Sequence, residues 1–115
     1  MVKPVVEIVA SGPGGRVIYR EGEDTQAFGW DLGGGDVIAT IYVPSPAEWD
    51  ARVPWAAGRR DEILATLARE VSRQKCRGCT IEIAERWIHL REAPPLLRRV
   101  AGAWRRFLRS LRENG

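Results

Sequence analysis

The sequence is poor in the residues on which metal and redox sites depend. Its 115 residues include one histidine, one methionine and two cysteines. A structural zinc site takes four ligands, and Cys76, Cys79 and His89 supply three at most, so a complete site would require a second copy of the chain. Two cysteines close together are not a disulfide framework either, which agrees with a reducing compartment. The sequence therefore predicts neither a metal nor a cofactor.

Long apolar segments are also lacking. No run reaches 18 apolar residues, the length of a membrane span, and residues 1–4 do not lead into the apolar block and cleavage site of a secretory signal. We therefore expect a cytoplasmic protein without a transmembrane segment. The length suits one domain, residues 1–115, that folds without a disulfide or a metal.

Lysine is scarce, and charge is unevenly distributed. There are 2 lysines and 16 arginines, a bias that GC-rich coding explains and that favours a bacterial origin. Residues 94–115 hold six arginines and one glutamate, a local charge of +5, whereas the other 93 residues carry 12 basic and 14 acidic side chains, or −2. An asymmetry of this kind can mark an interaction element at the C-terminus.

The clearest structural signal is a strand at residues 36–43, between a triple glycine and the Pro44-Ser45-Pro46 segment. Both of its faces are apolar, which is typical of a central strand. Three shorter alternating segments at 5–10, 16–20 and 26–32 precede it, separated by glycine-rich turns, and predict an antiparallel meander.

The third of these segments alternates large and small side chains. Phe28, Trp30 and Leu32 share one face, which we expect to be core. The opposite face, with Ala27 and Gly29, lies beside the outward residues of the central strand. It is either a shallow groove or the seat of the last helix.

The second half of the chain predicts two helices around a hairpin. A capping box at Ser45 and Glu48 starts a short helical turn through Asp50, and an apolar stripe predicts a helix over about 57–75. Strands follow at 80–84 and 87–91, then an amphipathic helix at about 95–113. The expected fold is α+β, an antiparallel sheet of about six strands in the order ββββ-α-ββ-α, with two amphipathic helices packed against it.

Cys76-Arg77-Gly78-Cys79 has the spacing of a redox or zinc motif. Redox pairs of the thioredoxin kind open a helix, whose positive end stabilises a thiolate, but this pair closes one. The position favours a structural interpretation, in which the cysteines are two small residues on either side of Gly78 and Gly78 is the left-handed residue that ends the helix. Whether the cysteines are free, bridged or metal-bound stays open. The glycine clusters at 12–15 and 33–35 lead into no helix and are explained as turns rather than phosphate loops.

An enzyme would need the polar residues at the ends of elements to converge. Asp31, Asp36, Asp50, Tyr42 and His89 are the candidates, but they follow no established catalytic spacing. The sequence thus favours a protein that is not an enzyme, and a small enzyme with a site at the sheet end remains an alternative.

Binding residues are suggested by tryptophans and arginines. Trp49 and Trp55, in the loop before the first long helix, either form a recognition surface or close the end of the core. The last helix carries the arginines Arg98, Arg99, Arg105, Arg106, Arg109 and Arg112 beside an apolar stripe. It can pack on its own sheet, on another protein or a second copy, on anionic lipid, or along a nucleic-acid backbone.

The function that the sequence favours is that of a small, non-catalytic protein-binding or accessory domain, with a homodimer as one form. Its partner-binding residues would be Trp49, Trp55, Arg98, Arg105, Arg106, Arg109 and Arg112. The nucleic-acid alternative, through the arginines of the last helix, predicts binding that weakens steeply with salt.

Overall fold

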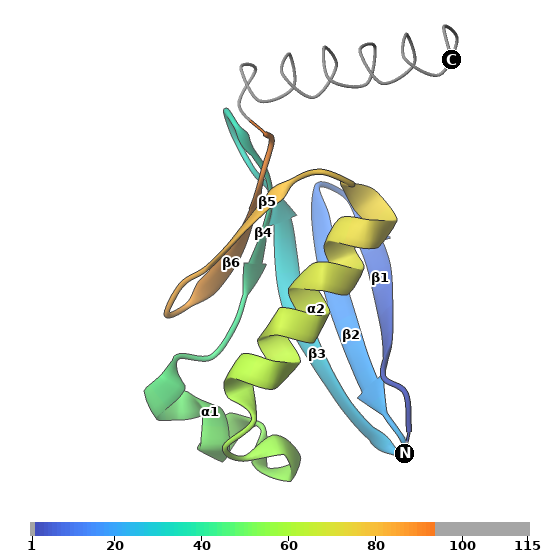
Figure 1. The fold of residues 1–115 in the computed structure, drawn as a ribbon, viewed down its shortest axis with the longest axis vertical. Coiled ribbons are helices and arrows are strands. Elements are labelled where there is room, and N and C mark those ends of the chain that lie inside the picture. The colour runs from blue at the N-terminus through green and yellow to red at the C-terminus, as the bar shows by residue number, and fades with distance from the viewer. Residues whose placement is uncertain (1, 94–115) are drawn as a thin grey trace, which may run out of the picture.

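The computed structural model describes residues 2–93, which form one sheet with helices against it (Figure 1). The elements in chain order are β1 (Val5–Ser11), β2 (Gly14–Glu21), β3 (Asp24–Leu32), β4 (Val37–Tyr42), α1 (Pro46–Arg52), the 3-10 helix η1 (Pro54–Ala56), α2 (Arg60–Lys75), β5 (Thr80–Ile83) and β6 (Trp87–Arg91). The α+β class is thus shown. The helix expected at about 95–113 lies outside the described residues.

The sheet has six strands in the order β1-β2-β3-β4-β6-β5, and every neighbouring pair is antiparallel. The predicted meander of β1 to β4 is confirmed. So is the hairpin of β5 and β6, whose turn is closed by the Ala84 amide donating to the Trp87 carbonyl. Because β4 pairs with β3 on one side and β6 on the other, the predicted central strand lies in the interior of the sheet.

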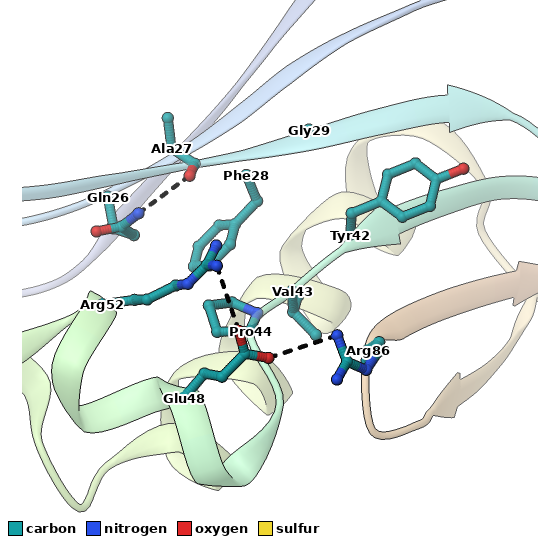
Figure 2. A pocket seen from close by; sticks show the side chains of 10 residues that line it. All are labelled: Gln26, Ala27, Phe28, Gly29, Tyr42, Val43, Pro44, Glu48, Arg52 and Arg86. Carbon is teal, nitrogen blue, oxygen red and sulfur yellow. Dashed lines mark hydrogen bonds and ion pairs between the residues drawn. The ribbon is translucent and has the colours of Figure 1, made fainter.

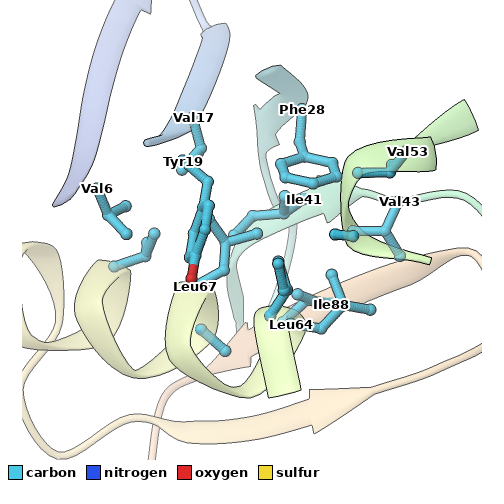
Figure 3. Packing of buried hydrophobic residues seen from close by; sticks show 14 of the residues in the cluster. Val6, Val17, Tyr19, Phe28, Ile41, Val43, Val53, Leu64, Leu67 and Ile88 are labelled. Carbon is cyan, nitrogen blue, oxygen red and sulfur yellow. The ribbon is translucent and has the colours of Figure 1, made fainter. Parts of the chain in front are cut away.

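The core lies between the sheet and α2, which runs diagonally across the strands (Figure 1). The predicted stripe of α2, namely Ile63, Leu64, Leu67, Ala68 and Val71, is buried throughout. Figure 3 shows Leu64 and Leu67 facing Tyr19 and Ile41 of the sheet. Each fully buried aliphatic side chain of this kind contributes about 1.5–3 kcal/mol through removal of apolar surface from water.

The predicted core face of β3 is buried only in part. Phe28 is 4% exposed, but Trp30 is half-buried and Leu32 is 60% exposed. The prediction that Leu32 is a core residue is therefore wrong. The physical reason is the length of α2, which ends at Lys75 and leaves a shallow apolar hollow of about 120 Å³ beside Trp30 and Leu32.

A polar tie joins each end of α2 to the sheet. At the N-terminal end, the Arg59 guanidinium binds both oxygens of Glu21 at 3.0 Å and also pairs with Glu62. These carboxylates raise the pKa of Arg59 above its usual value. At the other end, the Gln74 amide donates to the Val6 carbonyl at 2.9 Å. The helix is therefore fixed across the strands at both ends.

Candidate functional site

Within the described residues, the helices cover only one face of the sheet, and we call the other side the open face. Side chains alternate along a strand, so the neighbours of the core residues point to the open face. They include Tyr42 of β4 and Trp87 of β6, which are paired across the two strands and are 50% and 39% exposed. These large apolar groups reach solvent together rather than singly, and such groups are the usual signal of an interaction surface.

Three rings on the open face form what we call the aromatic strip, made of Tyr42, Trp87 and His89. Tyr42 and Trp87 are direct partners across β4 and β6, and Trp87 stacks on His89 with ring centroids 5.6 Å apart and planes inclined by 21°. The Tyr42 hydroxyl donates to the Asp31 carboxylate, and this hydrogen bond raises the pKa of Tyr42. The strip therefore presents stacked rings whose positions are fixed by the strand ladder.

Beside the strip, the sheet splits. β3 pairs with β4 only from Trp30 to Leu32, although β3 begins at Asp24. Extending the register that pairs Trp30 with Ile41 would place Pro44 opposite Ala27. Proline has no N–H to donate to a ladder, so no regular pair can form at that position, and the observed pairing already ends at Trp30 and Ile41.

Arg60 of α2 holds the strand end away from β3. Its guanidinium donates to three main-chain carbonyls, those of Pro44 at 3.0 Å, Ala84 at 3.2 Å and Glu85 at 2.7 Å. The end of β4 and the turn between β5 and β6 are thereby tied to the start of α2. The split is thus maintained by a half-buried side chain with a fixed set of acceptors.

A cleft of about 440 Å³ occupies the split. It is lined by Gln26, Ala27, Phe28 and Gly29 of β3, Tyr42, Val43 and Pro44 at the end of β4, Glu48 and Arg52 of α1, and Arg86 of the β5–β6 turn. Figure 2 shows the Phe28 ring inside the cleft and Glu48 between the two arginines. Its volume lies within the range of ligand-binding clefts.

Two arginines share one carboxylate at the mouth of the cleft. Glu48 pairs with Arg52 at 3.2 Å and with Arg86 at 3.5 Å, and both arginine side chains are about two-thirds exposed, at 66% and 65%. The buried Ser45 hydroxyl donates to Glu48 at 2.9 Å, and this bond, ahead of the two arginines, lowers the pKa of Glu48. The cluster therefore carries a net positive charge with an ionised glutamate at its centre.

The capping box differs from the prediction in one of its two halves. Ser45 is the N-cap of α1, but its hydroxyl makes no hydrogen bond to the helix backbone. It donates instead to the carboxylate of Glu48, while the Ser45 carbonyl accepts from the Glu48 and Trp49 amides. The Glu48 carboxylate also accepts from the Ser45 amide, so this half of the predicted capping box is confirmed, and the same side chain lines the cleft.

Of the two tryptophans predicted to bind a partner, Trp49 belongs to the core. It is 1% exposed, its indole donates to the Ala56 carbonyl at 2.9 Å, and its ring is stacked on Phe28 with centroids 6.2 Å apart. Trp55 is half-buried and stacks on Tyr19 at 6.1 Å. Trp49 therefore closes the end of the core, which was one of the two predicted alternatives. Neither Trp49 nor Trp55 lines the cleft. Partner binding by the arginines at 98, 105, 106, 109 and 112 stays a prediction, because they lie outside the described residues.

Two of the candidate catalytic residues, Tyr42 and His89, belong to the aromatic strip, and the aspartates are divided among different contacts. Asp31 is with Tyr42, whereas Asp36 and His89 each contact Arg91, at 3.4 and 3.3 Å. Asp50 is elsewhere, accepting from the Gly58 amide at 2.9 Å, where it supports the loop before α2. Only Tyr42 of this set lines the cleft.

The cysteines are joined to each other. Cys76 and Cys79 form a disulfide with Cα atoms 5.6 Å apart, so the bridged state is the one that this fold contains. Gly78 between them has φ +86°, in agreement with the predicted left-handed position after α2. A bridge is not what a reducing compartment favours, and the cytoplasmic location stays a prediction. Across residues 2–93, no three His, Cys, Asp or Glu side chains gather as a potential metal site.

The sequence analysis missed most of the cleft. The sequence did suggest a groove at the face of Ala27 and Gly29. It gave no sign of Arg52, Arg86 or Trp87, because the place of these residues depends on the assembled sheet and on the pairing of β4 with β6.

No helix in the described part of the chain is long and apolar enough to cross a membrane. Comparison of the whole chain with protein-family models, curated proteins and solved structures finds no match.

Proposed function

We propose that this chain is a protein-binding domain whose partner surface is the open face, centred on the aromatic strip of Tyr42, Trp87 and His89. The observation that supports the proposal is the one-sided arrangement of the helices. It leaves large apolar rings in solvent, on strands whose other face is fixed by the core. Rigid aromatic side chains supply contact area at a small cost in conformational entropy, which is why they are enriched where proteins bind one another.

Charge on the open face also favours a protein partner. Arg20 pairs with Glu7, and Arg91 lies between Glu82 at 3.0 Å and Asp36 at 3.4 Å. Basic and acidic groups are therefore mixed. A surface built for a nucleic-acid backbone would instead gather unpaired cations along the strands.

The first test is selection of polypeptide ligands. A displayed library of random peptides is selected on the immobilised full chain, and the enriched clones are measured against Trp87→Ala. We expect clones whose binding weakens about tenfold or more in this variant, since a central aromatic side chain contributes about 2 kcal/mol or more to an interface. Leu32→Ala is the matched control, because it removes a side chain that is 60% exposed on the helix-bearing face.

Self-association is measured on the same proteins by sedimentation at micromolar concentration. A dimer that dissociates in Trp87→Ala, but not in Leu32→Ala, would identify a second copy as a partner of the open face. A monomer that also enriches no clone, or only clones that bind Trp87→Ala as well as the original chain, would contradict the proposed function.

A further inference from the structure

The edge of β3 in the cleft is an unpaired strand edge within the sheet. From Thr25 to Gly29, no other strand of residues 2–93 pairs with β3 on the side that faces β4. Backbone groups of alternate residues point to opposite sides of a strand. The Leu32 amide donates towards β1 and β2, to the Pro13 carbonyl at 2.9 Å, so Gly29 and Ala27 present their N–H and C=O groups to the cleft.

The side chains along this edge leave it accessible. Ala27 and Gly29 are both small and exposed, and a Cβ added at Gly29 would meet no atom within 4 Å. Within the described part of the chain, the Ala27 carbonyl accepts one 3.2 Å hydrogen bond, from the side-chain amide of its neighbour Gln26, which a ligand can displace at little cost. An unpaired edge of this kind is a template for one more strand.

We infer that the cleft binds an extended segment of a partner protein as an added strand along Ala27 and Gly29, with an acidic side chain of that segment placed between Arg52 and Arg86. This inference rests on the proposed function and names the partner's chemistry. Main-chain hydrogen bonds give such a complex its affinity, and side-chain pockets give it specificity.

The acidic preference follows from the charges at the cleft mouth. Among residues 2–93, Arg52 and Arg86 share the single Glu48 carboxylate as their ion-pair partner, and both are largely exposed. A second carboxylate would give each arginine its own partner, and guanidinium groups bind carboxylates in a directed, two-donor geometry. Tyr42 at the wall of the cleft is 50% exposed and offers apolar contact to the neighbouring side chains of the segment.

Ala27→Pro tests the added strand directly. The substitution removes the N–H that faces the cleft but no ladder bond to β2, because Ala27 and Ile18 face each other without exchanging main-chain bonds. Fluorescence anisotropy with labelled peptides selected on the full chain is expected to show a loss of about tenfold or more in affinity. The control is Ala27→Val, which keeps the N–H and is expected to stay within about threefold of the original chain.

Hydrogen exchange of the unaltered full chain provides a second measurement that does not depend on any variant folding. The Ala27 and Gly29 amides are expected to exchange rapidly in the free protein and to become protected when a selected peptide is bound. Unchanged exchange at both amides in the saturated complex would overturn the added strand.

Arg86→Gln tests the acidic preference, with Arg69→Gln as the control, because Arg69 is an exposed arginine of α2 that does not line the cleft. Selected peptides are expected to be enriched in Asp and Glu, and to bind Arg86→Gln several-fold more weakly, with a smaller dependence on salt. Peptides without acidic residues, or an equal effect of the two variants, would overturn this part of the inference.

The outcomes separate the inference from the proposed function. Peptides that lose affinity for Trp87→Ala but bind Ala27→Pro normally would refute the added strand and leave the open face as the binding surface. A chain that selects no peptide but forms a dimer, which Ala27→Pro dissociates, would replace the partner segment with a second copy. No peptide and no dimer would refute both.

Discussion

At the residue scale, Trp49 and Trp55 are similarly placed side chains that differ in one hydrogen bond. Both lie in the connection between β4 and α2, and both stack on an aromatic residue of the sheet. The Trp49 indole donates to the Ala56 carbonyl, whereas the buried Trp55 N–H has no hydrogen-bond partner among residues 2–93. A buried donor without a partner costs about 1–3 kcal/mol in desolvation.

The same substitution should therefore have unequal effects at these two positions. Trp49→Phe removes the indole bond to the Ala56 carbonyl, which keeps only the Arg59 amide as a donor within residues 2–93, and it shrinks a ring that is 1% exposed. It is expected to lower the free energy of unfolding by about 2–4 kcal/mol. Trp55→Phe removes a polar group that was already unpaired, so its cost is expected to be about 1 kcal/mol or less. Urea denaturation of both variants measures the difference, and equal losses would show that ring volume alone decides the effect.

At the scale of the element, the β1–β2 hairpin depends on a glycine that no side chain can replace. Gly15 has φ +150°, and a Cβ at this position would lie 2.0 Å from the Val9 carbonyl oxygen of the adjacent strand. Gly15→Ala is expected to separate β1 from β2 and cost about 3 kcal/mol or more, because the obstacle is backbone. Gly29→Ala is the control, and since nothing lies near its Cβ it should change the free energy of unfolding by about 1 kcal/mol or less. Similar unfolding midpoints for the two variants would refute this role of Gly15.

Most elements could be predicted from the sequence, because their signals are local. Alternation identified the strands of the meander, and the 3.6-residue stripe identified α2. The start of α2 was predicted at about residue 57, but the helix begins at Arg60. The reason is that Gly58 adopts φ +76° and donates its amide to Asp50, which keeps the residues before Arg59 out of the helix. That contact joins residues of two different elements and has no local pattern.

The split in the sheet could not be predicted, although Pro44 was visible from the start. The pairing ends at Trp30 and Ile41, before the register would place Pro44 opposite Ala27, and the register itself depends on how β3 and β4 are joined. The three carbonyls that Arg60 binds lie 16 to 25 residues away along the chain. A cleft made by such long-range contacts follows from the assembled sheet and not from any one segment.

At the scale of the whole molecule, the proposed function gives the two faces of the sheet different roles. The helix-bearing side contains the buried cluster, with Leu64 and Ile41 at 0% exposure, whereas Tyr42 on the open face is 50% exposed. Stability should therefore depend on the first face and binding on the second. This separation is what allows an open-face variant to lose a partner while it keeps its fold.

Leu64→Ala and Ile18→Ala test the separation, since each removes part of a large aliphatic side chain from opposite sides of the same sheet. Leu64→Ala leaves a cavity in the core and is expected to cost about 2–5 kcal/mol. Ile18→Ala loses a partly solvated group and should cost about 1 kcal/mol or less. Chemical denaturation of the full chain measures both. If Ile18→Ala destabilises the fold as strongly as Leu64→Ala, the open face is covered in the folded chain and cannot be the partner surface. If only Leu64→Ala does so, changes in binding caused by Trp87→Ala or Ala27→Pro can be assigned to recognition, because the face that carries them contributes little to folding.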